Sequence, residues 1–302
     1  MKYFIIVMVL VVNMYSEIYN ENDTYIKDEK RYIKSTNQLL SGVLKVNEKI
    51  TGVSTITEYK YKNGLLDGEF VEYSTIDNGT YPKNFILRKG NFKNGLLDGT
   101  SYNYAPDLIG NNKSILAHSS EWKNGKKNGL DKEFYLGGYP SCENYIGNIR
   151  TEINYLNDIR KYTKVFSCNG NLYKYIYEKN SNGIIKVEEY FPNGNVEIEI
   201  PFIEFNFNNI KNSIVDGEIK VFYENGNLNA LINVNKEEYM NYKNATVKVF
   251  YNNGNLGREF IVQDKKVIEG YNYTREGKKI KMTMAHLHNY SNLNSNPLIL
   301  DE

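Results

Sequence analysis

The strongest constraint on the fold of this chain is a block of eight residues that occurs three times. The blocks read YKNGLLDG at 61–68, FKNGLLDG at 92–99 and WKNGKKNG at 122–129. Asn and Gly most readily adopt the positive φ angles of a tight hairpin turn. Aromatic residues, which favour strands, precede each turn, and Tyr73, Tyr104 and Phe134 follow at a constant distance. Each block therefore predicts a β-hairpin closed by a type I′ turn.

A second form of the same signal occupies the C-terminal half. It reads YFPNGNV at 190–196, FYENGNL at 222–228 and FYNNGNL at 250–256, with weaker versions in FSCNGNL at 166–172 and FYLGG at 134–138. We expect these to be type I′ hairpin turns as well, on arms of unequal length. The expected turn glycines of the two forms are Gly64, Gly68, Gly95, Gly99, Gly125, Gly129, Gly138, Gly170, Gly194, Gly226 and Gly254.

A single hairpin cannot bury its apolar face, so tandem hairpins must stack on their neighbours to form a core. The sequence therefore predicts an all-β fold, an elongated single-layer antiparallel sheet of tandem β-hairpin repeats over residues 38–290. Residues 149–160 (IRTEINYLNDIR) fit either a short helix or two strands joined at Asn157-Asp158, and the strand interpretation is favoured.

The two kinds of block resemble the MORN (membrane occupation and recognition nexus) repeat family, and the second resembles bacterial MORN-variant repeats found in proteins labelled as antitoxins. The resemblance covers about residues 40–280, and it weakens at 140–165 and 260–285. It implies MORN-like hairpin arrays used for protein contacts or membrane association. In family members that are enzymes the chemistry lies in an attached domain, and this chain has no stretch outside the repeats long enough to be one.

The N-terminus predicts export. Lys2 is followed by the apolar run YFIIVMVLVV at 3–12 and a small residue at Ser16, the pattern of a signal peptide over 1–16. An uncleaved anchor or a buried N-terminal segment is the alternative. We expect residues 17–37 to be a polar linker and residues 291–302 a flexible tail. We expect the protein to be periplasmic, attached to the cell envelope or secreted.

The mature chain has two cysteines, Cys142 and Cys168. In an oxidising compartment they are able to form a disulfide, whereas two separate thiols facing the sheet interior fit the sequence equally well.

The sequence contains no phosphate-binding loop, dinucleotide fingerprint, nucleophile elbow or zinc-protease motif. A Ser-His pair at His118 and Ser119 is a weak candidate for catalysis. Alternation along a strand would place Met282, Met284, His286 and His288 on one face, and such ligands suit copper, but a strand spaces them too widely for one ion. We therefore expect no enzyme activity, cofactor or metal. The 37 basic and 36 acidic residues give no basic surface for nucleic acid.

Aromatic residues are the main candidates for contact, because tyrosine combines a large apolar area with a polar tip. The candidates are Tyr73, Tyr102, Tyr104, Trp122, Tyr135, Tyr223 and Tyr251. They predict a protein-binding or scaffolding module, with an antitoxin-like or immunity role as a narrower form. The alternative is attachment to a membrane lipid or envelope polymer through the repeated turn lysines Lys62, Lys93 and Lys123.

Overall fold

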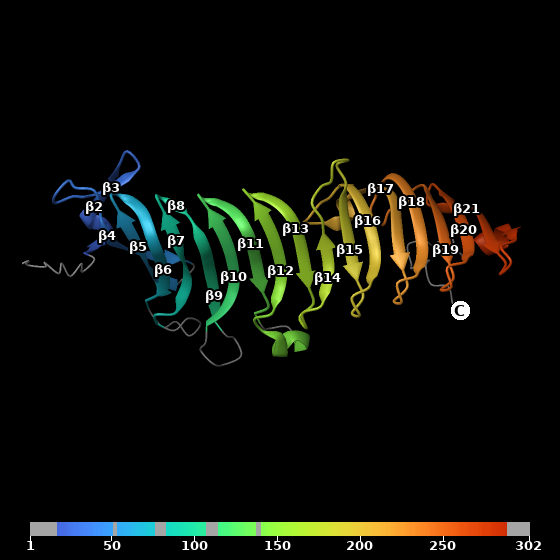
Figure 1. The fold of residues 1–302 in the computed structure, drawn as a ribbon, viewed down its shortest axis with the longest axis horizontal. Coiled ribbons are helices and arrows are strands. Elements are labelled where there is room, and N and C mark those ends of the chain that lie inside the picture. The colour runs from blue at the N-terminus through green and yellow to red at the C-terminus, as the bar shows by residue number, and fades with distance from the viewer. Residues whose placement is uncertain (1–16, 51–52, 76–82, 107–113, 137–139, 289–302) are drawn as a thin grey trace, which may run out of the picture. The chain divides into compact units, whose positions relative to one another are not determined.

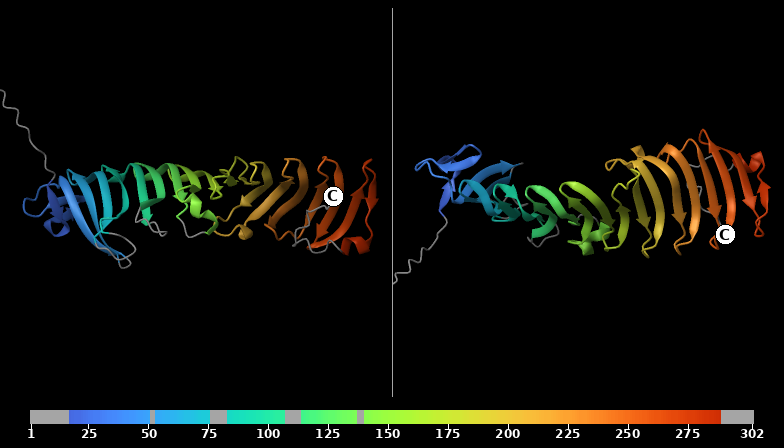
Figure 2. Two further views of the ribbon diagram at one scale, coloured as in Figure 1. Left: turned by 90° about the horizontal axis from the view of Figure 1, so that it is seen from below. Right: turned by 45° about the horizontal axis from the view of Figure 1, so that its top comes forward.

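The computed structural model describes residues 17–50, 53–75, 83–106, 114–136 and 140–288, and the chain divides into two compact units, Met1–Lys127 and Asn128–Glu302. Nearly all regular structure in the described residues is β-strand. In each unit the strands lie side by side in one curved layer, and the predicted all-β class of tandem antiparallel hairpins is confirmed (Figures 1 and 2).

In the first unit, successive strands from β4 to β10 pair antiparallel with their neighbours, and β7 pairs with both β8 and β9. Strand β1 pairs parallel with β4, and β2 and β3 form a separate two-stranded sheet. The strands are β1 (Ile18–Asn20), β2 (Thr24–Lys27), β3 (Lys30–Ile33), β4 (Gly42–Ile50), β5 (Val53–Lys62), β6 (Leu65–Ser74), β7 (Ile86–Lys93), β8 (Leu96–Leu97), β9 (Gly99–Pro106) and β10 (Ser114–Lys123).

The three eight-residue blocks form two-residue turns in which both central residues have positive φ. The angles are +50° and +85° at Asn94 and Gly95, and the turns at 63–64 and 124–125 match them closely. This is the type I′ geometry that the blocks predict.

The second and third of these turns are also bound to the preceding block. The N–H of Gly95 donates to the carbonyl of Leu66 at 2.7 Å, and the N–H of Asn94 donates to the carboxylate of Asp67 at 3.3 Å. The turn at Asn124 repeats both contacts, with the carboxylate of Asp98 at 3.2 Å. The acidic residue near the end of one block therefore holds the turn of the next.

The prediction of a polar linker over 17–37 is wrong, because this segment forms β1, β2, β3 and the 3-10 turn η1 (Glu21–Asp23). The N–H of Arg31 donates to the carbonyl of Gly64 at 2.9 Å, and the N–H of Gly64 donates to the carbonyl of the fully buried Leu40 at 2.8 Å. Main-chain pairing needs no apolar side chains, so a polar sequence is able to form this cap on the first hairpin.

In the second unit, strands pair antiparallel in chain order from β11 to β22. The strands are β11 (Lys126–Phe134), whose first two residues precede the unit boundary, β12 (Ile149–Leu156), β13 (Ile159–Phe166), β14 (Leu172–Ile176), β15 (Ile185–Tyr190), β16 (Val196–Glu204), β17 (Ile214–Phe222), β18 (Leu228–Glu238), β19 (Ala245–Phe250), β20 (Leu256–Gln263), β21 (Lys266–Tyr273) and β22 (Lys279–Lys281). Two 3-10 segments, η2 (Pro140–Tyr145) and η3 (Ile210–Asn212), and the short helix α1 (Met284–His288) complete it.

The Asn-Gly-Asn turns of this unit have a different geometry, so the type I′ prediction is wrong for them. Gly226 has a φ of +89°, but Asn225 is not among the described residues with positive φ. The N–H of Gly226 donates to the carbonyl of Tyr223 at 2.8 Å, and the strand register shifts beside the turn. This is a type I turn followed by a left-handed glycine and a bulge. The side chain of Asn225 accepts the N–H of Asn227 at 3.0 Å, which favours this turn.

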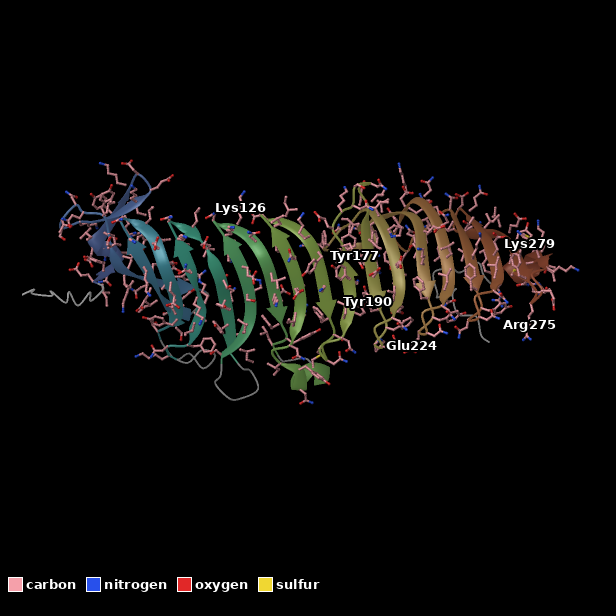
Figure 3. The ribbon with its side chains drawn as sticks, viewed as in Figure 1. Lys126, Tyr177, Tyr190, Glu224, Arg275 and Lys279 are labelled. Carbon is pink, nitrogen blue, oxygen red and sulfur yellow. A yellow bond between two sulfur atoms is a disulfide. The ribbon has the colours of Figure 1, made fainter. Side chains whose placement is uncertain are left out.

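In three of these turns, the second asparagine joins the turn to the next one along the same edge. The side-chain amides of Asn171, Asn195 and Asn227 donate to the carbonyls of Pro192, Glu224 and Asn252 at 3.2, 2.8 and 2.6 Å. Figure 3 labels Glu224 and, at the last turn, Arg275 along this edge. The Asn-Gly-Asn pattern thus contains a repeated amide contact, which we call the asparagine ladder.

One face of the second unit carries its core. Fully buried residues include Val187, Ile200 and Phe202, and loop residues such as Phe205 and Tyr239 pack against them. At the C-terminal end, Leu287 of α1 joins the same cluster. The core face is therefore covered by the unit's own loops and by α1.

Residues 149–160 form two strands with positive φ at Asn157 and Asp158, as the strand interpretation predicts. The predicted strand over 282–288 is wrong. Met282 is buried in the core, Met284 is 76% exposed, and α1 begins there, so the two do not share a strand face. His286 lies 3.1 Å from the hydroxyl of Thr283, and the side chain of His288 lies outside the described residues.

Candidate interaction surface

The second face of the second unit carries a continuous row of side chains, one from each strand. Because Val187 belongs to the core, alternation along β15 places Glu188 on the opposite face. Cross-strand pairing extends this position over the whole unit. The row is Lys132, Glu152, Lys164, Tyr175, Glu188, Glu199, Lys220, Leu231, Lys248, Glu259, Tyr271 and Lys281.

Four tyrosines gather around the N-terminal part of this row, and we call them the tyrosine patch: Tyr162, Tyr175, Tyr177 and Tyr190. The rings of Tyr162 and Tyr175 stack at 5.6 Å across two strands, and those of Tyr175 and Tyr177 lie 4.2 Å apart. None of the four is buried. Figure 3 labels Tyr177 and Tyr190 beside β14 and β15.

A carboxylate, Glu188, lies at the base of the patch. It accepts the hydroxyls of Tyr190 at 2.5 Å and of Tyr177, and the ammonium of Lys186 at 2.6 Å. Burial alone would raise the pKa of Glu188, but these three donors hold that pKa below its ordinary value. Burial, together with the hydrogen bond to Glu188, raises the pKa of Tyr190.

Lysines add cation–π contacts inside the patch. The Lys164 ammonium lies 5.1 Å from the ring centre of Tyr162, and that of Lys186 lies 4.4 Å from the ring centre of Tyr177. Lys164 also lies 3.8 Å from a carboxylate oxygen of Glu152. The patch is therefore rich in aromatic area and hydrogen-bonding groups, with positive and negative charges intermixed.

The same chemistry recurs on this face at β20 to β22. Lys279 lies 3.8 Å from the ring centre of Tyr271 and 2.8 Å from a carboxylate oxygen of Glu259, and Tyr273 donates to Glu259 at 3.0 Å. The hydrogen bond with Glu259 is the main cause that raises the pKa of Lys279 to about 12.

Three of the predicted contact aromatics lie on one face of the first unit. Tyr102 and Tyr104 are 6.5 Å apart, and the ammonium of Lys89 lies 5.5 Å from the ring of Tyr102. Tyr73 donates to Glu58 at 2.9 Å. Trp122 projects from the other face and donates its indole N–H to the hydroxyl of Ser101 at 2.9 Å.

Tyr135 and Tyr223 have structural contacts in the second unit. Their hydroxyls donate to the carbonyls of Phe166 and Phe250, one hairpin further along, at 2.7 and 2.8 Å. Tyr251 is 42% exposed beside a turn, and Gly257 leaves space for its ring. These residues therefore do not converge with the tyrosine patch.

The other predicted site residues have clear positions. The predicted turn glycines all have positive φ except Gly138, which lies outside the described residues. Cys142 of η2 and Cys168 form a disulfide with their Cα atoms 5.6 Å apart. His118 and Ser119 point to opposite faces of β10, and the imidazole lies 3.4 Å from Ser120 instead.

Lys62, Lys93 and Lys123 are exposed, each at the end of a strand next to a type I′ turn of the first unit. Leu96, which follows one of these turns, is 50% exposed. This edge therefore combines positive charge with some apolar surface.

The sequence interpretation missed the tyrosine patch, although a signal for it was present. Tyr175 and Tyr177 alternate at the period of a strand, which places both on one face. The strand has no aromatic-Lys-Asn-Gly motif of its own, so the turn motifs alone do not indicate this patch.

No helix in the described residues has both the length and the apolar character needed to span a membrane, and no group of three or more His, Cys, Asp or Glu among them converges to hold a metal ion. Neither a protein-family model nor a curated protein matches the sequence. Among solved structures, a protein of unknown function from Bacteroides fragilis aligns with 12% identity and a TM-score of 0.14, over 53% of this chain and 91% of that chain. At this TM-score the similarity supports no inference about function.

Proposed function

We propose that this chain is an exported, non-catalytic binding protein that contacts a protein partner through the tyrosine patch. The observation that carries the proposal is the tyrosine patch around Glu188, whose four tyrosines are not buried and lie on the sheet face opposite the core. Tyrosine is enriched in protein interfaces, where it contributes area at low conformational cost. The signal-peptide pattern at 1–16 supports export, although these residues lie outside the described part of the structure.

Hydrogen bonding and ring contacts, rather than net charge, define the chemistry of this surface. Lysines and glutamates are intermixed in the row, and some pair across strands, as Lys220 and Glu199 do at 3.7 Å. A balanced surface of this kind gives little long-range attraction to a charged polymer. The partner is therefore a protein surface of mixed charge, and an immunity-like or antitoxin-like role is the narrower form of this proposal.

The test uses the chain without residues 1–16 as bait in cell-envelope extract, with captured proteins identified by mass spectrometry. We expect the variant Tyr162→Ala/Tyr175→Ala, which removes the stacked pair, to capture the partner at least tenfold less well. The control is Tyr251→Ala, which removes an exposed ring at a turn of the same unit. Equal capture by both variants would overturn the proposal, provided that circular dichroism shows both to be folded.

A second candidate is attachment to an anionic membrane or envelope polymer through Lys62, Lys93 and Lys123. Their shared exposure at one edge of the first unit, beside the exposed Leu96, favours it. Replacing the three lysines by Gln would abolish salt-sensitive binding to anionic vesicles. The control triple Lys211→Gln, Lys236→Gln and Lys243→Gln removes exposed charges from η3, from β18 and from the β18–β19 loop of the second unit.

A further inference from the structure

The connection between β11 and β12 contains a turn of the same kind as the Asn-Gly-Asn turns, although no Asn-Gly-Asn motif marks it in the sequence. In the regular turn at Gly170, Ser167 accepts the glycine N–H and donates its own N–H to Asn171, both at 2.9 Å. Tyr135 makes the same pair of bonds with Gly147 and Asn148, again at 2.9 Å. Gly147 has a φ of +86°, close to the +92° of Gly170.

The contacts to the next hairpin are reproduced as well. The side-chain amide of Asn148 donates to the carbonyl of Cys168 at 2.9 Å, as Asn171 does to Pro192 at the following turn. The hydroxyl of Tyr135 binds Phe166 as that of Tyr223 binds Phe250. The connection is therefore an ordinary turn with residues 136–146 inserted where the regular turn has only residues 168–169.

The inserted stretch includes η2, which lies at the edge of the sheet below β12 and β13 in Figure 1. Its Cys142 is bonded to Cys168, the first of the two residues between Ser167 and Gly170. The side-chain hydrogen bonds from Tyr135 to Phe166 and from Asn148 to Cys168 already join the two hairpins. The disulfide instead attaches η2 to the neighbouring turn.

We propose that the Cys142–Cys168 disulfide is a thiol-exchange site that fixes η2 against the sheet edge and releases it on reduction, while the sheet stays folded. Both cysteines are half-buried, so a reductant is able to reach them. A dithiol reductant supplies the two electrons. Its thiolate attacks one sulfur and forms a mixed disulfide, and its second thiol then displaces the protein sulfur. The products are two protein thiols and one oxidised dithiol.

The experiment compares the full chain with and without dithiothreitol, the variant Cys142→Ser/Cys168→Ser, and a variant in which residues 136–146 are replaced by Pro-Asn, the pair at 192–193. Limited proteolysis is followed by mass spectrometry, and far-ultraviolet circular dichroism reports the strands. We expect cleavage within 140–145 to be at least tenfold faster in the reduced protein and in the serine variant. The circular dichroism of all forms should match that of the oxidised protein at 25 °C.

The shortened variant, in which Pro-Asn replaces residues 136–146, distinguishes the role of the turn bonds from that of the inserted residues. If it folds with an unchanged strand signal, the turn bonds of Tyr135, Gly147 and Asn148 are sufficient without the inserted residues. Loss of the strand signal on reduction would overturn the proposal, because the disulfide would then support the sheet. An unchanged cleavage rate at 140–145 would overturn it as well, because η2 would be held by other contacts.

Discussion

The side-chain amide of Asn227 donates a 2.6 Å hydrogen bond to the main-chain oxygen of Asn252 and so connects two successive hairpin turns. The contact joins residues 25 positions apart, and equivalent contacts occur at Asn171 and Asn195. The third residue of the Asn-Gly-Asn pattern thus acts between turns. The first asparagine does so as well at Asn193 and Asn225, whose side-chain amides donate to the Glu224 carbonyl and the Asn252 side chain at 2.9 and 2.6 Å.

Replacing Asn227 with Asp removes this donor and places a carboxylate beside a carbonyl oxygen. We expect the free energy of unfolding of the second unit to fall by about 1 kcal/mol, the usual net contribution of a hydrogen bond. Urea denaturation followed by circular dichroism measures it. Asn255→Asp changes the same position of the last Asn-Gly-Asn turn and should cost less than half as much. Equal losses would show that the ladder contact does not stabilise the protein.

Asp98 should have a comparable role in the first unit, because its carboxylate accepts the N–H of Asn124 at 3.2 Å. Asp98→Ala leaves that turn N–H without its partner, and we expect a loss of about 1 kcal/mol in unfolding free energy. Asp98→Asn retains an acceptor oxygen and should lose clearly less. If urea denaturation gives the same midpoint for Ala and wild type, then the acidic residue of the block does not hold the next turn.

Gly95 has a φ of +85° and ample space, because an added Cβ would meet only the Leu65 side chain, at 3.8 Å. Any destabilisation by substitution therefore arises from the backbone conformation. Gly95→Val should lower the unfolding free energy by about 1–2 kcal/mol, and Gly95→Asn by less, since Asn tolerates the left-handed region. A melting temperature of Gly95→Val equal to that of wild type would contradict the turn geometry.

Glu188 should make stability depend on pH in the acidic range. Its pKa in the folded protein lies below the ordinary value of 4.5, because Lys186, Tyr177 and Tyr190 donate to it. The unfolded state therefore binds the proton more readily, and the stabilisation is present above about pH 4.5 and is lost as the pH falls through the folded-state pKa.

The measurement is the thermal midpoint of wild type and of Glu188→Gln from pH 7 to pH 3. The difference between the two proteins should be largest near neutral pH and should shrink as the pH falls. The control is Glu197→Gln, which changes a half-buried glutamate nearby on β16. This variant should follow the wild-type profile. A difference that stays constant with pH would show that the ionised carboxylate of Glu188 has no special stabilising role.

The fold could be predicted from the sequence because its turns are encoded by few residues of narrow conformational preference. The pair Asn94-Gly95 alone specifies a two-residue hairpin, and the repetition of its block specifies the array. The distinction between the two turn types was missed, because both contain Asn-Gly and the difference lies in the hydrogen bond from Asn227 to the Asn225 side chain.

Other features depend on contacts between distant residues. The inserted stretch before Gly147 removes the regular spacing, so Gly138 was the predicted turn glycine although Gly147 has the turn geometry. The cap formed by residues 17–37 rests on main-chain bonds such as that from Arg31 to Gly64, which polar composition does not reveal. Glu188 becomes notable only when strand pairing brings Tyr177 and Tyr190 to it.

The contacts between successive blocks of the first unit also have a consequence for the addition of further repeats to the protein. Asp67 receives the turn of the second block, and Asp98 receives that of the third, through the same atoms. The first two blocks thus each contain the acceptor that the turn of a following copy requires. We expect an in-frame duplication of one whole repeat, from the aromatic residue that opens the first block to the residue before the aromatic residue that opens the second, to join at both ends without any compensating mutation.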